Sequence, residues 1–184
     1  MSREKKWRSN SKFLSLILRH KPESVGLSLD AQGWAQTEAL LEVLSSQSRA
    51  MSLSELQLLV ANNDKKRFEF SPDGTRIRAS QGHSLKVDLQ LQAITPPDEL
   101  FHGTVEKYMS SILRDGLIPG SRHHVHLSDD TETARRVGSR RGKAIILKVA
   151  AGKMHERGFS FYRSANGVWL TDRVPTDFLK KCPG

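Results

Sequence analysis

Residues 67–79, RFEFSPDGTRIRA, decide the fold of the amino-terminal half of the chain. Apolar and polar residues alternate on both sides of residues 72–74, which is typical of strands that bury one face. The Pro-Asp-Gly sequence of residues 72–74 favours a tight turn between them. The stretch therefore predicts a β-hairpin in which Arg76 and Arg78 share one face while Ile77 takes the other.

Helices are expected upstream of this hairpin. In chain order, the sequence predicts a helix capped by Ser9, Asn10 or Ser11 and stopped by Pro22, a short strand over residues 25–30 (VGLSLD), a turn at Gln32-Gly33, a second helix capped by Thr37, and a third helix opened by a capping box of Ser52 and Glu55. A winged helix has this order of helix, short strand, two helices and hairpin. Some winged helices bind nucleic acid and others bind proteins, so the order alone does not decide a function.

Short strands and short helices alternate in the carboxy-terminal half. The expected strands cover residues 99–104, 124–128, 144–150, 159–163 and 167–171, and the expected helices cover residues 105–115, ending at Gly116, and 129–137, capped by Ser128. Elements this short point to a compact, mostly antiparallel α+β lobe. Residues 95–98, Thr-Pro-Pro-Asp, are the expected boundary, because two consecutive prolines interrupt both helix and sheet. The chain has no GxGxxG after a strand and no GxxxxGK[ST], so neither a Rossmann site nor a P-loop is supported.

The balance of charge points to a polyanionic partner. The 184 residues carry 29 Lys and Arg against 20 Asp and Glu, a formal net charge of +9. Residues 1–21 hold seven basic groups and one acidic group, and residues 134–143 hold five basic groups and no acidic one. Clustered cations gain free energy by releasing counterions from nucleic acid, although a solvated surface explains such runs equally well.

The sequence gives no reason to expect secretion or membrane contact. One cysteine, Cys182, cannot form an internal disulfide. No apolar stretch is long enough to cross a membrane, and the basic amino terminus lacks the apolar segment of a signal peptide. We therefore expect a cytoplasmic protein.

Arg19 and His20 are the first candidates for chemistry, because they fall at the end of an amphipathic helix. Cations at a helix C-terminus are favourable in themselves, which is the simpler explanation. The functional explanation is a phosphate ligand beside an acid–base group, and an imidazole with a pKa near 6.5 suits that second role. Arg76 and Arg78 are open to the same two interpretations, a solvated face or a bidentate grip on phosphate.

Histidines and a glycine-flanked arginine are the candidates in the other half. His102, Gly103 and Thr104 end a predicted strand, and a glycine there lets another group approach the backbone closely. His123, His124 and His126 form a cluster in which the last two share a strand face, but without a nearby carboxylate or thiolate they make an incomplete ligand set. No metal site is therefore expected. Arg140 follows Gly138 and Ser139 in a basic loop that could hold phosphate.

Taken together, these segments resemble the RNA 2′-phosphotransferase family, relatives of the tRNA-splicing phosphotransferase. The matching stretches are residues 11–22 (SKFLSLILRHKP), 30–34 (DAQGW), 64–70 (DKKRFEF), 73–84 (DGTRIRASQGHS), 101–104 (FHGT), 124–128 (HVHLS), 134–140 (ARRVGSR) and 166–171 (NGVWLT). The resemblance implies an α+β protein with two lobes. A winged-helix-like lobe for RNA and phosphate would span residues 1–94, and an NAD-binding lobe of the ADP-ribosyltransferase type would span residues 98–184.

The resemblance also implies a reaction. An internal RNA 2′-phosphate is moved onto NAD, through an ADP-ribosylated RNA phosphate, to give dephosphorylated RNA, nicotinamide and ADP-ribose 1″,2″-cyclic phosphate. The phosphate site it implies consists of Arg19, His20, Arg78 and Arg140, and the NAD site consists of His102, Gly103, Thr104, His126, Ser128, Gly138 and Val168. The expected partners are NAD and a tRNA-like 2′-phosphorylated RNA, bound by a monomer without a metal.

Two other classes of function remain open. An ADP-ribosyltransferase acting on nucleic-acid ends or on protein would release nicotinamide without forming the cyclic phosphate. Many protein-modifying relatives carry a glutamate where this chain has Val168, which argues against ordinary protein ADP-ribosylation. A winged-helix protein that only binds nucleic acid would show steep salt dependence and no nicotinamide release.

Overall fold

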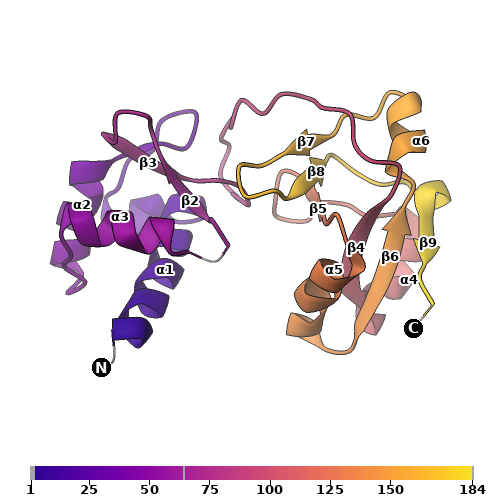
Figure 1. The fold of residues 1–184 in the computed structure, drawn as a ribbon, viewed down its shortest axis with the longest axis horizontal. Helices are drawn as coiled ribbons and strands as arrows, with labels where there is room; N and C mark the ends of the chain where they lie inside the picture. The colour runs from indigo at the N-terminus through magenta and orange to yellow at the C-terminus, as the bar shows by residue number, and fades with distance from the viewer. Residues whose placement is uncertain (1–2, 64, 184) are drawn as a thin grey trace. The chain divides into compact units, whose positions relative to one another are not determined.

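The computed structural model describes residues 3–63 and 65–183, and it divides the chain into two compact units, Met1–Gln90 and Leu91–Gly184. Helices and small antiparallel sheets occur in both units, which confirms the α+β class (Figure 1). Pro96 and Pro97, the expected boundary, lie a few residues into the second unit. Within the described residues, none of the helices has the length and apolar character needed to cross a membrane.

The first unit combines three helices with a three-stranded sheet. The helices are α1 (Arg3–Arg19), α2 (Thr37–Ser46) and α3 (Leu53–Ala61), and the sheet has the order β1-β3-β2, with β1 at Ala35–Gln36, β2 at Phe68–Phe70 and β3 at Arg76–Ala79. Leu14, Ile17 and Leu18 of α1 are fully buried against the other helices and the sheet. Their spacing gives α1 one apolar face, which the hydrophobic effect drives inward.

The hairpin is confirmed. Strands β2 and β3 pair antiparallel, with Glu69 opposite Arg78 and Phe70 opposite Ile77. Ile77 is fully buried, while Arg76 and Arg78 stay half-buried on the other face. The turn is held by the Asp73 carboxylate, which accepts hydrogen bonds from Ser71 and Thr75. These bonds lower the pKa of Asp73 to about 2.

Three expectations for the first unit are wrong in their details. Helix α1 begins at Arg3 rather than near Ser9, because Ser9 and Asn10 use their side chains to accept bonds from Arg49 instead of capping a helix. Residues 25–30 form no strand, since Pro22–Val25 make a 3-10 turn that ends at Gly26 in the left-handed conformation. Thr37 is the first residue of α2 rather than its cap.

The capping box of α3 is confirmed. The Ser52 side chain accepts a bond from the Glu55 backbone nitrogen, and the Glu55 carboxylate accepts one from the Ser52 nitrogen. These reciprocal bonds satisfy two backbone donors that a helix start otherwise leaves open.

The second unit contains two three-stranded antiparallel sheets. One has the order β4-β6-β9, with β4 at Leu100–Val105, β6 at Ala144–Val149 and β9 at Leu179–Lys181, and the other has the order β5-β8-β7, with β5 at Val125–Leu127, β7 at Tyr162–Arg163 and β8 at Trp169–Thr171. Reciprocal backbone bonds between Phe101 and Ser128 join the two sheets. The expected strands are confirmed as antiparallel, while β9 was missed.

Three helices accompany these sheets: α4 (Glu106–Asp115), α5 (Thr131–Gly138) and α6 (Ala151–Glu156). Helix α4 ends before Gly116 as expected, but α5 is capped by Asp130, whose carboxylate accepts from Thr133, and not by Ser128. Ser128 lies two residues before that cap, where its backbone pairs with Phe101. Helix α6 was not expected from the sequence.

Helix α5 packs very closely on β4 (Figure 1). A Cβ on Gly103 would overlap the backbone oxygen of Ala134, and a Cβ on Gly138 would lie 3.1 Å from the carbonyl oxygen of Thr104. The group that approaches the backbone at Gly103 is therefore the helix itself. This contact fixes the end of α5, from which the chain continues directly to Arg140.

Candidate functional site

Arg19 and His20 lie where α1 stops. Arg19 is the last residue of the helix, and Pro22 follows in the next turn. The ring nitrogen Nδ1 of His20 lies 2.9 Å from the hydroxyl of Ser84, whose backbone nitrogen donates to the Arg19 carbonyl. Ser84 therefore binds the helix end twice and holds the imidazole in a defined orientation.

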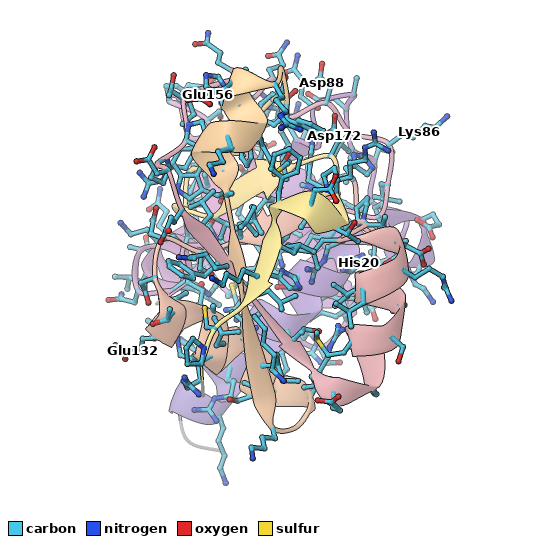
Figure 2. All side chains as sticks on the ribbon, turned by 90° about the vertical axis from the view of Figure 1, so that its right-hand side faces the viewer. His20, Lys86, Asp88, Glu132, Glu156 and Asp172 are labelled. Atoms are coloured by element: carbon cyan, nitrogen blue, oxygen red, sulfur yellow. The ribbon has the colours of Figure 1, made fainter. Side chains whose placement is uncertain are left out.

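The segment that carries Ser84 is anchored on both sides. His83 is buried and packs against Gly33, where a Cβ would lie 3.3 Å from the histidine Nε2. Further along, the Asp88 nitrogen donates to the Ala31 carbonyl at 2.8 Å. Figure 2 shows Lys86, which is exposed, projecting away from this segment. Ser84 was not identified from the sequence, because 64 residues separate it from His20 and no local pattern reports their contact.

Arg78 is held by three partners on its own strand face. Its Nε donates to a carboxylate oxygen of Glu69 at 2.8 Å, and its Nη1 lies 3.4 Å from the Gln32 carbonyl. The guanidinium carbon lies 4.3 Å from the centre of the Trp34 ring, a cation–π contact. These contacts do not use the Nη2 donors, so the fork can still bind an anion through its outer edge.

Arg76 contacts the same ring from farther away. Its guanidinium carbon is 5.4 Å from the Trp34 ring centre, and its Nη1 is 3.5 Å from a carboxylate oxygen of Asp30. With 40% of its side chain exposed against 16% for Arg78, Arg76 is the less constrained of the two. Arg78 is therefore the better-positioned anion ligand.

Arg19 and Arg78 both contact β2 or the residue before it. Arg19 donates from Nη2 to the Arg67 carbonyl at 3.5 Å, and Arg78 is paired with Glu69 two residues later. Arg19, His20 and Arg78 thus all lie in the first unit. Arg140 lies in the second unit, with the histidines described next.

His102 of β4 is enclosed and held in one tautomer. Its Nδ1 lies 2.9 Å from the backbone oxygen of His126, and since a carbonyl only accepts, Nδ1 carries the proton. Burial lowers the pKa of His102 against the opposing effect of this hydrogen bond, and the positive charges of Arg122 and Arg141 lower it further. The ring is neutral at physiological pH, and Nε2 is its acceptor.

In His126 of β5, the ring nitrogen Nδ1 has the opposite hydrogen-bonding role to that of His102. Its Nδ1 lies 3.4 Å from Nη1 of Arg122, and a guanidinium can only donate, so this Nδ1 is the acceptor. The Nε2 atoms of the two histidines thus have opposite roles, an acceptor on His102 and a donor on His126 in its neutral form. A pair of this kind can recognise a ligand that carries both donors and acceptors.

Arg122 was not identified from the sequence as a candidate. Burial of its guanidinium lowers its pKa first, and then the charges of Arg141 and Arg140 do so, although the residue as a whole is exposed. Arginine remains charged despite such a shift. The charges of Arg122, Arg140 and Arg141 therefore affect one another, and together they create a concentrated positive field suited to an anionic group.

The remaining predicted site residues have structural positions of their own. Thr104 is buried in β4, Ser128 joins the two sheets, and Val168 is half-buried with its backbone making three hydrogen bonds to Ser164. The Nε2 atom of His124 lies 3.6 Å from Oδ1 of Asp172. Burial lowers the pKa of His124, against the opposing effect of that carboxylate. Across residues 3–63 and 65–183, no group of three or more His, Cys, Asp or Glu side chains comes together in a way that could hold a metal ion.

Comparison with known proteins adds a family to this geometry. Residues 5–173 match the family model described as RNA 2'-phosphotransferase, Tpt1 / KptA family. A relative from Pseudomonas fluorescens is 54% identical over 171 residues, covering 92% of this chain and 94% of its own length. A relative from Hahella chejuensis is 54% identical over 176 residues, with coverage of 96% and 95%, and one from Flavobacterium johnsoniae is 52% identical over 173 residues, with coverage of 94% and 95%. All three carry the name "Probable RNA 2'-phosphotransferase". This chain therefore belongs to the RNA 2′-phosphotransferase family.

Proposed function

We propose that the protein is an NAD-dependent RNA 2′-phosphotransferase that moves an internal RNA 2′-phosphate onto NAD. Membership of the family supports the transfer of a 2′-phosphate. The observation that carries the proposal is the Arg19–His20 pair, held by Ser84 at the end of α1 in the same unit as the oriented Arg78. Cations and an acid–base group are what phosphoryl transfer requires.

In this proposal the two units have different tasks. Residues 1–94 form a winged-helix-like lobe that binds RNA and its phosphate, and residues 98–184 form an ADP-ribosyltransferase-like lobe that binds NAD. The order of helices and hairpin in the first unit and the two small antiparallel sheets in the second support these assignments. The protein acts as a monomer in the cytoplasm on a tRNA-like 2′-phosphorylated RNA.

The second unit offers donors and acceptors that fit NAD as a co-substrate. His102 and His126 present ring nitrogens of opposite hydrogen-bonding role, which suits the hydroxyl groups of a ribose, and Arg122 with Arg141 suits the diphosphate. We assign NAD binding to His102, Thr104, His126, Ser128 and Val168, with Gly103 and Gly138 setting the position of α5 beside them. No metal takes part in the proposed reaction.

The reaction has two steps. First, an oxygen of the RNA 2′-phosphate attacks the ribose C1″ of NAD and nicotinamide leaves, which chiefly requires that the phosphate be positioned. Then the ribose 2″-hydroxyl attacks phosphorus and the RNA 2′-oxygen leaves. Arg19, Arg78 and Arg140 stabilise the charge that builds on the phosphoryl oxygens. His20 moves the proton that the second step requires, with Ser84 holding its ring.

The test is incubation with NAD and a 2′-phosphorylated RNA oligonucleotide, with all products resolved by mass. Dephosphorylated RNA, nicotinamide and ADP-ribose 1″,2″-cyclic phosphate support the proposal. Nicotinamide release without the cyclic phosphate would show an ADP-ribosyltransferase instead. RNA binding with steep salt dependence and no nicotinamide release would show a protein that only binds nucleic acid.

A His20→Ala variant tests the assigned role. It should slow the second step more than the first, by about 10²–10⁴-fold, so that phospho-ADP-ribosylated RNA accumulates. If nicotinamide release stops and no intermediate appears, the role assigned to His20, chiefly in the second step, is wrong. Near-normal turnover after Arg78→Ala or Arg140→Ala would reject the phosphate assignment.

A further inference from the structure

Helix α1 is held along both edges of its packed side. Nη1 of Arg49 donates to Ser9 Oγ at 2.9 Å and to Asn10 Oδ1 at 3.0 Å. On the other edge, the Asn63 side chain donates to Ser11 Oγ at 3.0 Å. The buried apolar face lies between these edges. The rotation of α1 about its own axis is therefore fixed, and so is the identity of the side chains on its outer face.

That outer face carries a row of cations. Lys5, Arg8 and Lys12 are exposed, and a helix with 3.6 residues per turn places them within about 60° of one another and of Arg19. Leu16, which is 44% exposed, fills the turn between Lys12 and Arg19. We call Lys5, Arg8 and Lys12 the cationic stripe. It lies outside the proposed phosphate site and ends at it.

We propose that the cationic stripe binds the backbone phosphates of the RNA strand that flanks the reacting 2′-phosphate. This inference rests on the proposed function, because it takes Arg19 as the ligand of that phosphate. The charge of the stripe complements a polyanion, and its line along α1 leads to Arg19. A rise of 1.5 Å per residue places Lys12, Arg8 and Lys5 about 10, 16 and 21 Å from Arg19 along the axis.

These lengths set the size of RNA that can reach the stripe. At one phosphate per about 3.4 Å in a stacked strand, 21 Å corresponds to about six nucleotides, and an extended strand needs fewer. A trinucleotide that carries the 2′-phosphate can occupy the site around Arg19 without reaching Lys5 or Arg8. The stripe should therefore contribute affinity only for longer RNA.

The magnitude follows from counterion release. For single strands, log K changes with log[salt] by about −0.7 for each neutralised phosphate, so three contacts give a slope of about −2. At about 0.1 M salt this corresponds to as much as roughly 100-fold in affinity. The difference between long and short RNA should shrink steeply as salt is raised.

The experiment compares two triple variants of equal charge in the full chain. In K5Q/R8Q/K12Q the stripe is removed, and in K153Q/K180Q/K181Q three other exposed lysines are neutralised as the control. kcat/KM is measured with saturating NAD on a 2′-phosphorylated trinucleotide and on an RNA with about ten nucleotides on each side of the same phosphate. Salt-dependent binding of the long RNA is measured in parallel, and circular dichroism checks that the helices are intact.

The expected result is a loss of up to roughly 100-fold on the long RNA for the stripe variant, with a salt slope weaker by about 2, and little change on the trinucleotide. The control variant should change neither kcat/KM on the long RNA nor the salt slope of binding to that extent. Equal losses in both variants, equal losses on both substrates, or no loss on the long RNA would overturn the proposal. If no variant of the enzyme turns over any RNA, the proposed function fails, while the salt slope of binding still tests the stripe.

Discussion

Replacing Gly103 by alanine should destabilise the second unit, although backbone entropy alone predicts the opposite. In a strand, exchanging glycine for alanine is favourable by about 0.5–1 kcal/mol. At Gly103, however, the new Cβ would overlap the Ala134 oxygen and lie 2.7 Å from the Ala134 carbonyl carbon and 2.9 Å from the Gly138 nitrogen. These are backbone atoms, so no side chain can turn aside, and α5 must shift as a whole. Overpacking of this kind costs about 3 kcal/mol.

Gly120→Ala is the matched control. A Cβ there meets nothing within 4 Å, and the positive φ of 62° costs about 1 kcal/mol by itself. Urea unfolding followed by circular dichroism gives the change in stability, and hydrogen exchange of residues 131–138 measured by mass spectrometry reports on α5. Gly103→Ala should lower the free energy of unfolding by about 2 kcal/mol more than the control and speed exchange in α5. Equal stability of both variants with unchanged exchange in α5 would refute the packing argument.

Three further predictions concern Ser84, His102 and Glu69. Ser84→Ala should lower kcat about 2–10-fold while leaving the KM for NAD unchanged, because a bond of about 0.5–1.5 kcal/mol to His20 is lost; an unchanged kcat would argue against the tether. His102 stays neutral in the fold but protonates in the unfolded chain below a pKa of about 6.5, so stability should fall as the pH drops through that value. His102→Gln should flatten this dependence in thermal melts from pH 5 to 8, and an equal slope in both proteins would contradict the assignment. Glu69→Ala should cost about 1–2 kcal/mol of stability and raise KM for RNA more than for NAD, since Arg78 loses its 2.8 Å partner; rescue by Glu69→Asp in steady-state assays would confirm positioning.

Local chemistry was predictable from the sequence. The capping box of Ser52 and Glu55 involves residues three apart, and the hairpin around Asp73 is specified by its own turn. In each case the signal and the structure lie within one short segment, so a pattern of residue types suffices. The alternation that buries Ile77 and leaves Arg78 on the other face is equally local.

The predictions that failed concern residues whose structural partners lie far away in the sequence. Ser9 and Asn10 have the composition of caps, but Arg49, about 40 residues away, uses them for tertiary bonds. Arg122 contacts His126 only four residues away, but it gains its significance from Arg140 and Arg141 beyond α5, which its own neighbourhood does not indicate. The roles of Arg19, His20, Arg78 and Arg140 came from the resemblance, and they remain predictions.

The double contact of Ser84 has a consequence for the order in which the first unit folds. Helix α1 can form early, since its backbone bonds are local, but its last turn gains Ser84 only after a loop of more than sixty residues closes. Closing such a loop is entropically costly, and contacts of this sequence separation usually form late. The Ser84→Ala variant should then fold at the normal rate and unfold faster, the signature of a contact absent from the transition state. The geometry around His20 would thus be among the last features to form and the first to be lost.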